Sequence, residues 1–437
     1  MAALSTTLPL TRDSVFWAHK VVKNHVHRTP VVTNQTLSEL ASTPRTAEDL
    51  QGTRFAGRTP AKPTLRLWFK CENLQRIGAF KVRGAFYALH KLTEEPGWLE
   101  GGGKEKGVVT HSSGKMISSC FGLTVTLGSS MELEICSDQL SLFQLKTITY
   151  TQSTGNHAQA LALAARENGI KAHIVMPEIS IPAKIAATKG YGANVVFSGS
   201  TSVEREAVTE KVIAETGARL VPPYDHPDIM LGQGTLGLEL QDQVESSFAS
   251  SVNSVGQGLR GVYEASLKKT KGNKEGLDAI IAPCGGGGML SGVALSCEGT
   301  GIRVFGAEPS FQGADDAKRG YESGERIPAV SSLTVADGLR TPVGVHPWSV
   351  IYERRLVSGM YSVTDEEILK AMRFVYERMK LVVEPSACVP LAVALFDEDF
   401  RSLVEKEAGE EGWDLGLVFS GGNVAVDSLG KLLAGEK

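Results

Sequence analysis

Short apolar runs alternate along the chain with longer segments whose apolar residues recur at helical spacing. The short runs predict buried strands, and the longer segments predict amphipathic helices. The predicted strands are Leu65 to Phe69, Gly107 to Thr110, Ala172 to Met176 and Ala279 to Ala282, and the predicted helices include Val15 to His27, Val82 to Leu92 and one from Pro182. This alternation predicts an α/β fold in which helices cover the faces of mostly parallel sheets.

Two connecting stretches have the composition of exposed loops. Residues 43–63 are rich in Thr, Pro, Arg and Gly, and residues 245–276 are rich in Ser, Gly and Lys. Polar, turn-forming residues between periodic segments predict loops inserted at the surface. A chain of 437 residues is also longer than one small core requires, so two domains that share one site are expected.

The segment from Lys115 to Gly155 differs from its surroundings, because it contains no Ala, Pro, Arg or Asn. Removing it joins its flanks into HSSGNHAQAL, a loop that opens a helix. The codons GGT for Gly114 and AAG for Lys115 would spell a splice donor, and ACA for Thr154 with the first base of Gly155 would spell an acceptor. We therefore hypothesise a translated intron, whose removal keeps the reading frame and regenerates one glycine. A genuine surface insertion is the alternative.

Composition and charge exclude several classes of protein. Hydrophobic residues make up 42% of the chain and charged residues 22%, and no apolar run approaches the length of a membrane span. The net charge of −4 comes from interspersed charges of both signs, so nucleic acid is not an expected partner. The N-terminus lacks the basic and apolar regions of a secretory signal, and we expect a cytoplasmic protein.

The cysteines show no spacing typical of a zinc site or of a redox pair. Several of them lie inside apolar runs, so buried and reduced thiols are expected. They are Cys71, Cys120, Cys136, Cys284, Cys297 and Cys388.

The first candidate for chemistry is Lys81, in the sequence GAFKVRGA, where a predicted loop meets a predicted helix. A lysine that is partly removed from water has a lowered pKa and can form a Schiff base with a carbonyl group. Taken alone, a lysine at the start of a helix is more often a solvated side chain.

Two glycine-rich turns follow predicted strands. Gly285 to Gly288, in PCGGGGMLSG, leave backbone amides open to an anion, to which the following helix adds its positive N-terminal end. The pattern is neither a nucleoside-triphosphate loop nor a dinucleotide loop, so a small phosphate ester is favoured. The second turn, VFSGGNV, contains Ser420 at a strand end, where its hydroxyl can meet a ring nitrogen. Taken alone, the second turn is as consistent with an ordinary turn as with a cofactor-binding one.

The motifs occur in the order GAFKVRGA, HSSG, NHAQAL, PCGGGGMLSG, GAEPS, VADG, ERMKLVVEPSA and FSGGNV. In this order they resemble the serine racemase and serine/threonine dehydratase family, which is pyridoxal-phosphate dependent and tryptophan-synthase-β-like, with fold type II. The resemblance covers nearly the whole chain outside the insertions. It implies two domains, each with a mostly parallel twisted sheet flanked by helices, and pyridoxal 5'-phosphate at their interface. The large domain would comprise residues 1–105 and 228–437, and the small domain residues 106–227.

The resemblance implies a role for each motif in holding the cofactor. Lys81 would bind it as a Schiff base, and Phe80 would pack beside the ring. Asn156 would donate to the phenolic oxygen, and Ser420 would face the pyridine nitrogen. The phosphate would be held by Gly285, Gly286, Gly287, Gly288 and the amide of Met289.

The resemblance also implies residues that act on the substrate. Ser112 and His157 match the loop that receives the substrate carboxylate. Ser113 matches the serine on the face opposite Lys81, and racemisation needs two such groups because one removes the α-proton and the other returns it. If the inserted segment is retained, Thr154 would compete for the place of Ser113.

A magnesium or calcium site is a further implication of the resemblance. Glu308, Ala314 and Asp316 match a site of two carboxylates, one carbonyl and waters, although their spacing is longer than the usual one. Solvated surface acids are the alternative interpretation. Arg205 could be a substrate-side cation by position, but an exposed arginine on a helix is the favoured interpretation.

The implied activity is β-elimination from L-serine or L-threonine, which yields ammonia and a 2-oxo acid, together with racemisation of serine. A threo-3-hydroxyaspartate ammonia-lyase is the alternative among enzymes, because it would use the same residues. A non-catalytic protein that binds pyridoxal phosphate and a glycine-rich nucleotide-binding regulator are the alternatives of other classes. The resemblance also implies a homodimer.

Overall fold

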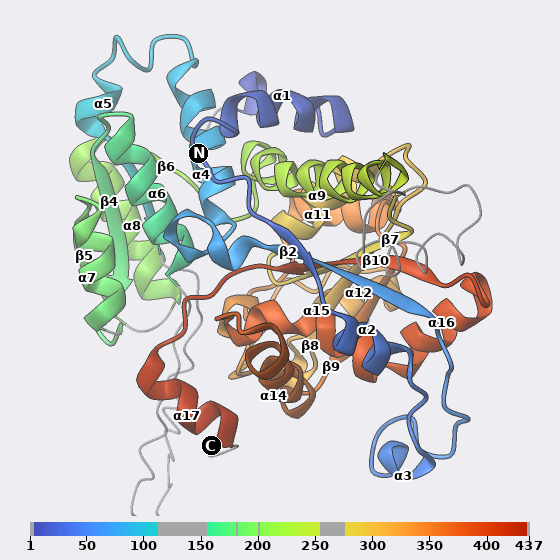
Figure 1. The fold of residues 1–437 in the computed structure, drawn as a ribbon. Helices are drawn as coiled ribbons and strands as arrows, with labels where there is room; N and C mark the ends of the chain where they lie inside the picture. The colour runs from blue at the N-terminus through green and yellow to red at the C-terminus, as the bar shows by residue number, and fades with distance from the viewer. Residues whose placement is uncertain (1–3, 112–154, 181, 200–201, 254–275, 435–437) are drawn as a thin grey trace, which may run out of the picture.

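The structure is a computed structural model that describes residues 4–111, 155–180, 182–199, 202–253 and 276–434 (Figure 1). In this part of the chain the strands form two sheets, and helices cover them. The helices are α1 (Arg12–Val22), α2 (Gln35–Ser42), α3 (Ala47–Leu50), α4 (Lys81–Thr93), α5 (Gly103–Lys106), α6 (Asn156–Glu167), α7 (Pro182–Gly190), α8 (Ser202–Thr216), α9 (Pro227–Asn253), α11 (Gly288–Cys297), α12 (Asp316–Ser323), α13 (Val345–Trp348), α14 (Asp365–Phe374), α15 (Pro385–Phe396), α16 (Glu398–Ala408) and α17 (Val426–Ala434).

The larger sheet has six strands in the order β1-β2-β10-β7-β8-β9. All neighbouring strands are parallel except β1, which runs antiparallel to β2 at one edge. The last strand of the chain, β10, therefore lies in the interior of the sheet, between β2 and β7. The strands are β1 (Val31–Thr33), β2 (Leu65–Cys71), β7 (Ala279–Pro283), β8 (Arg303–Pro309), β9 (Gly359–Val363) and β10 (Trp413–Phe419).

The smaller sheet has four parallel strands in the order β5-β4-β3-β6. Its strands are β3 (Val108–His111), β4 (Ala172–Pro177), β5 (Asn194–Ser198) and β6 (Arg219–Leu220), so they all come from the middle of the chain. The two mostly parallel sheets confirm the predicted α/β fold. The boundaries of the small domain at residues 106 and 227 lie just outside this sheet, and they stay a prediction.

The core is built on the two faces of the larger sheet, because successive residues of a strand point to opposite faces. On β10, Val418 packs in one hydrophobic cluster with α1, α4, α9 and α11, and Leu417 packs in another with α2, α14, α15 and α16. Ile280 and Ile281 of β7 divide in the same way. Figure 1 shows these two helix layers on either side of the sheet.

The observed elements differ from the predicted ones at several ends. The N-terminal helix ends at Val22, several residues before the predicted end at His27. Residues 245–253 were predicted as part of a loop, but they form the last part of α9. Phe248 is buried against the core, and this packing outweighs the low helix propensity of the Ser-rich sequence. Residues 43–63 include the short helix α3, and Leu50 and Phe55 in this stretch are buried.

Two predictions on composition can be checked in the described residues. Within them, no helix is long and apolar enough to cross a membrane. Four cysteines are buried and free, as predicted: Cys71, Cys284, Cys297 and Cys388. Cys120 and Cys136 lie outside the described residues.

Candidate active site

Lys81 is the first residue of α4 and enters a pocket near the carboxyl end of β2. Its amine donates a 2.7 Å hydrogen bond to the carbonyl oxygen of Pro223 and lies 5.2 Å from the centre of the Phe80 ring. Burial lowers the pKa of Lys81 to about 8, although the carboxyl group of Glu384 acts in the opposite direction. An amine with this pKa is partly neutral near physiological pH, and a neutral amine is the form that attacks a carbonyl.

Gly285 to Gly288 connect β7 to α11 and line the same pocket. A Cβ atom on Gly286 would lie 2.3 Å from the ring of Tyr224, and one on Gly285 would lie 2.9 Å from the Cα of Leu339. Gly287 has a φ of +82°, which side chains rarely adopt. The cradle therefore has room for backbone alone, and it fits a phosphate group at the start of a helix. Met289, in the first turn of α11, also lines the pocket.

Ser420 follows β10 directly and is buried in the wall of this pocket. Its carbonyl oxygen accepts a 3.0 Å hydrogen bond from the backbone N–H of Phe80. This contact is possible because β10 lies between β2 and β7 in the sheet, and the carboxyl ends of parallel strands meet at one edge. The lysine, the glycine cradle and the serine are thus brought together, as the sequence predicted.

Asn156, the first residue of α6, lines the pocket from the side of the smaller sheet. Its amide nitrogen donates to a carboxyl oxygen of Glu384 at 3.3 Å, and its amide oxygen accepts from Asn423 at 2.7 Å. Burial, and next to it the negative charge of Asp337, raise the pKa of Glu384 to about 8. A carboxylic acid that is neutral at pH 7 is therefore hydrogen bonded to a residue expected to bind the cofactor.

Glu384 was not among the predicted site residues, although it stands in the motif ERMKLVVEPSA. The signal that the sequence offered was the position of Glu384, an acidic residue at the end of an apolar run and directly before Pro385. Such an acid is usually an exposed cap at a helix start, and only the packing shows that it is buried. Tyr224, Gly338, Thr341 and Ser386 also line the pocket and were not predicted.

His157 follows Asn156 in α6 and is buried. Its Nε2 lies 3.3 Å from the carbonyl oxygen of Val221, and burial, assisted by the charge of Lys81, lowers its pKa to about 3. The imidazole is therefore neutral at pH 7, so it can act as a hydrogen-bond donor but not as a cation. Ser112 and Ser113 lie outside the described residues, as do residues 115–154 of the inserted segment.

Glu308 and Asp316 are both buried, near the end of β8 and at the start of α12. Each carboxyl oxygen of Glu308 accepts a backbone N–H, Oε1 from Ala317 at 3.1 Å and Oε2 from Lys318 at 2.8 Å. Burial is the main cause that raises the pKa of Glu308 well above its ordinary range, and the charge of Asp316 adds to it. The interpretation as solvated surface acids is therefore wrong.

Asp316 completes the pair. Its Oδ2 accepts the backbone N–H of Val343 at 3.0 Å, and its Oδ1 is buried without a hydrogen-bond partner among the described residues. Ala314, which is also buried, precedes it by two positions, so its carbonyl belongs to the same turn. Two buried carboxyl groups with an unpaired oxygen suit a hard divalent cation, which takes oxygen ligands.

Arg205 lies on α8, and the prediction of an exposed arginine is wrong. It is only 2% exposed, and burial lowers its pKa below the ordinary arginine range. Its place on a helix is as predicted, but it lies on a buried face of α8. The pocket of Lys81 is not lined by Arg205.

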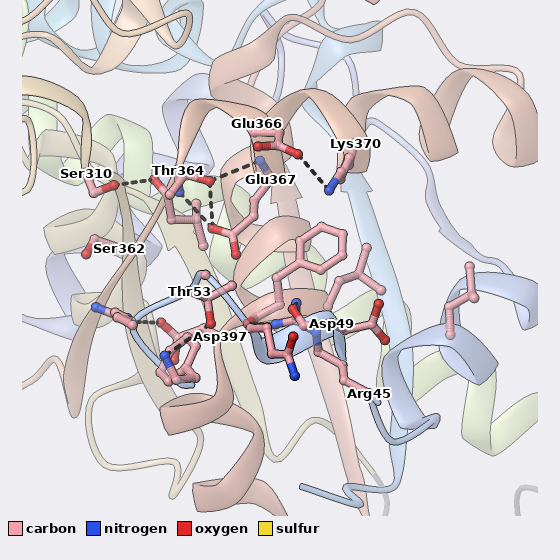
Figure 2. A pocket seen from close by; sticks show the side chains of 18 of the residues that line it. Arg45, Asp49, Thr53, Ser310, Ser362, Thr364, Glu366, Glu367, Lys370 and Asp397 are labelled. Atoms are coloured by element: carbon pink, nitrogen blue, oxygen red, sulfur yellow. Dashed lines mark hydrogen bonds and ion pairs between the residues drawn. The ribbon is translucent and has the colours of Figure 1, made fainter. Parts of the chain in front are cut away.

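A second cavity, of about 700 Å³, lies between α2, α14 and the ends of β9 and α15 (Figure 2). Figure 2 shows Lys370 beside Glu366, and these two side chains form an ion pair at 2.9 Å. Asp397 at the other end of the cavity is paired with Arg54. None of the predicted site residues lines this cavity, so the chemistry is expected in the pocket of Lys81.

The chain is similar to several known proteins. The family model of pyridoxal-phosphate dependent enzymes matches residues 53–120 and 137–412. A serine racemase of Dictyostelium discoideum is 34% identical over 429 residues, covering 97% of this chain and 98% of the relative. An L-threo-3-hydroxyaspartate ammonia-lyase of Saccharomyces cerevisiae is 32% identical over 430 residues, covering 98% of this chain and 97% of the relative. The structure of maize serine racemase, 32% identical, matches with a TM-score of 0.67 and covers 97% of each chain.

The match to the family model and the similarity to relatives both extend over most of the chain, and the glycine cradle, Lys81 and Ser420 fit the cofactor of the family. The chain therefore belongs to the family of pyridoxal-phosphate dependent enzymes.

Proposed function

We propose that the protein catalyses β-elimination from L-serine or L-threonine, releasing ammonia and a 2-oxo acid, and that it also racemises serine. The observation that carries this proposal is the meeting of the Lys81 amine, the glycine cradle and the Ser420 hydroxyl in one pocket. Relatives named serine racemase and L-threo-3-hydroxyaspartate ammonia-lyase support an activity on small hydroxy-amino acids.

Lys81 would move the α-proton of the substrate. Its pKa of about 8 lets the amine accept a proton at neutral pH and return it within one reaction cycle. Bound pyridoxal phosphate supplies a conjugated system that accepts the negative charge left at the α-carbon. Ser420 would face that ring with a neutral hydroxyl, which would not keep the ring nitrogen protonated. The weaker electron withdrawal suits elimination, because the β-hydroxyl departs promptly.

Ser113 would serve as the second proton-transfer group on the face opposite Lys81, and Ser112 and His157 would receive the substrate carboxylate. These assignments rest on the resemblance to the family, because Ser112 and Ser113 are outside the described residues. The neutral state of the His157 imidazole supports a role as hydrogen-bond donor. Reprotonation from the Ser113 side would give D-serine.

The second candidate is elimination from L-threo-3-hydroxyaspartate. The relative from Saccharomyces cerevisiae that carries this name matches the chain almost as closely as the serine racemase from Dictyostelium. The same lysine and cradle would act, and the site would have to accept a second carboxylate. A magnesium or calcium ion at Glu308, Ala314 and Asp316, a homodimeric state and a cytoplasmic location complete the proposal.

The experiment that tests the proposal is a substrate panel. The purified full-length chain is incubated with pyridoxal phosphate and with L-serine, L-threonine or L-threo-3-hydroxyaspartate, and 2-oxo acid and D-serine are quantified. We expect the parent to turn over L-serine or L-threonine. The variant Lys81→Ala should lose this turnover, and the surface control Lys104→Ala should keep it. Preference for hydroxyaspartate would favour the second candidate. Cofactor absorbance without turnover of any substrate would indicate a non-catalytic binding protein.

A further inference from the structure

Arg83 lies in α4 two residues after Lys81, and its side chain is fully buried. Its Nε and Nη2 donate to the two oxygens of Glu72 at 2.7 and 2.8 Å. Its Nη1 and Nη2 donate to the two oxygens of Glu239, both at 2.8 Å. One planar guanidinium therefore binds two carboxylates in bidentate fashion, the arrangement that fixes an arginine most firmly.

The cluster around Arg83 is electrically balanced. Lys70 is also fully buried, and its amine donates to Glu239 at 2.8 Å, so two cations meet two carboxylates. Burial alone would raise the pKa of Glu239, but the charges of Arg83 and Lys70 outweigh burial and lower the pKa to about 2. The two cations and the two carboxylates compensate one another in the interior, so removal of one leaves an uncompensated charge there.

The cluster ties α4 to the larger sheet and to α9. Glu72 directly follows β2, and Glu239 is in the middle of α9. The two helices cross in close contact, since a Cβ on Gly232 of α9 would lie 2.6 Å from the Cα of Gly84 in α4. At this crossing Gln233 accepts the backbone N–H of Gly84 at 3.2 Å.

The opposite side of α9 contacts α11, the helix that begins in the glycine cradle. A Cβ on Gly292 of α11 would lie 2.6 Å from the backbone nitrogen of Gly234 in α9. Helix α9 thus stands between the helix that carries Lys81 and the helix that starts at Gly288. The separation between the amine and the cradle depends on how firmly α4 is held against α9.

Arg83 is placed to control the direction of Lys81 as well. Two residues that are two positions apart project from opposite sides of a helix. Because Arg83 is fixed in the interior, rotation of the first turn of α4 about its axis is blocked, and Lys81 is directed into the pocket.

We propose that Arg83 is a positioning residue, which sets the place of the Lys81 amine relative to the glycine cradle through its pairs with Glu72 and Glu239. The proposal rests on the proposed function in one respect, that Lys81 and the cradle bind the same pyridoxal phosphate. Displacement of one end of such a site by a fraction of an ångström weakens cofactor binding even when the fold survives.

The test compares Arg83→Met with Arg401→Met. Arg401 is an equally buried arginine, paired with Glu398 at 3.0 Å on the other face of the sheet, away from the pocket. Both variants are expected to melt at a lower temperature than the parent. Only Arg83→Met is expected to bind pyridoxal phosphate more weakly, by about tenfold or more. The pH midpoint of the absorbance of bound cofactor should also shift in that variant alone.

Two further variants keep the test decisive if Arg83→Met does not fold. Arg83→Lys retains the charge without the planar fork, and its cofactor affinity should lie between those of the parent and of the methionine variant. Gln233→Met loosens the crossing of α4 and α9 without removing a buried charge, and it should weaken cofactor binding in the same direction.

The proposal would be overturned if the folded Arg83 and Gln233 variants bound the cofactor as tightly as Arg401→Met and with the same absorbance. Cofactor binding is measured without substrate, so the two proposals fail separately. A chain that binds cofactor in an Arg83-dependent way but converts no hydroxy-amino acid would contradict the proposed function alone.

Discussion

The amine of Lys81 is hydrogen bonded to the carbonyl oxygen of Pro223, in the segment between β6 and α9. The next residue, Tyr224, packs its ring over Gly286, where a Cβ would lie 2.3 Å away. One dipeptide therefore contacts the lysine with its backbone and the glycine cradle with its side chain. The two halves of the expected cofactor site are coupled through this short segment as well as through the sheet.

The contact between Tyr224 and Gly286 makes the cradle sensitive to one added methyl group. We expect Gly286→Ala to weaken pyridoxal phosphate binding by about tenfold or more, because either the tyrosine or the cradle has to move. The measurement is a titration of the cofactor-free chain followed by absorbance. Gly190→Ala is the control, since a Cβ at Gly190 meets nothing within 4 Å. Equal affinity in the two variants would show that the cradle does not contact the cofactor.

The buried carboxyl group of Glu384 predicts that the unfolding free energy of the cofactor-free protein depends on pH. Burial raises its pKa from 4.5 to about 8, so between these values the folded chain holds a proton that the unfolded chain releases. Its contribution to stability is therefore present at low pH and is lost as the pH rises through this range. Between about pH 5 and pH 8, the parent should lose about 2 to 4 kcal/mol more unfolding free energy than Glu384→Gln. Urea unfolding at several pH values measures this difference, and parallel curves for the two proteins would contradict the prediction.

The carboxyl pair of Glu308 and Asp316 predicts stabilisation by a divalent cation. A ligand that binds only the folded state adds about 2.7 kcal/mol at 100 times its dissociation constant. We expect magnesium or calcium to raise the melting temperature of the chelator-treated parent, and to leave that of Glu308→Gln and Asp316→Asn unchanged. Asp242→Asn is the control, because Asp242 is an exposed carboxylate that is paired with Arg28. An equal rise in melting temperature in all of these proteins would show that the cation binds elsewhere.

The inserted segment predicts that the chain with residues 115–155 and the chain without them differ in activity. Gly155, directly before α6, has a φ of +55°, and removal of residues 115–155 leaves Gly114 in that position. The family match also leaves residues 121–136 unmatched. We expect the mature transcript to lack these codons, and the shortened chain to release 2-oxo acid about tenfold or more faster than the full chain, because its HSSGNH loop is continuous. Transcripts that retain the codons, together with equal rates, would refute the intron hypothesis.

Two parts of the site could be predicted from the sequence because they directly follow apolar strands. Gly285 and Ser420 come after β7 and β10, and parallel strands bring such positions to one edge. Lys81 opens the helix that comes after the loop following β2, so its motif and not a strand end indicated it. The order of the strands could not be predicted, because pairing between β10 and its neighbours depends on contacts between distant parts of the chain. Burial of Glu384 and Arg205 was missed for a related reason, since charge in a sequence suggests exposure unless the packing around it is known.

The position of β10 has a consequence for how the protein is made. A ribosome synthesises Trp413–Phe419 after nearly all of the chain has emerged, and until then β2 can pair only with β1, and β7 only with β8. The nascent chain thus carries two open strand edges, which are prone to association with other chains. A chain that ends before Trp413 would lack the strand that joins β2 to β7, and both of these strands would keep an unpaired edge.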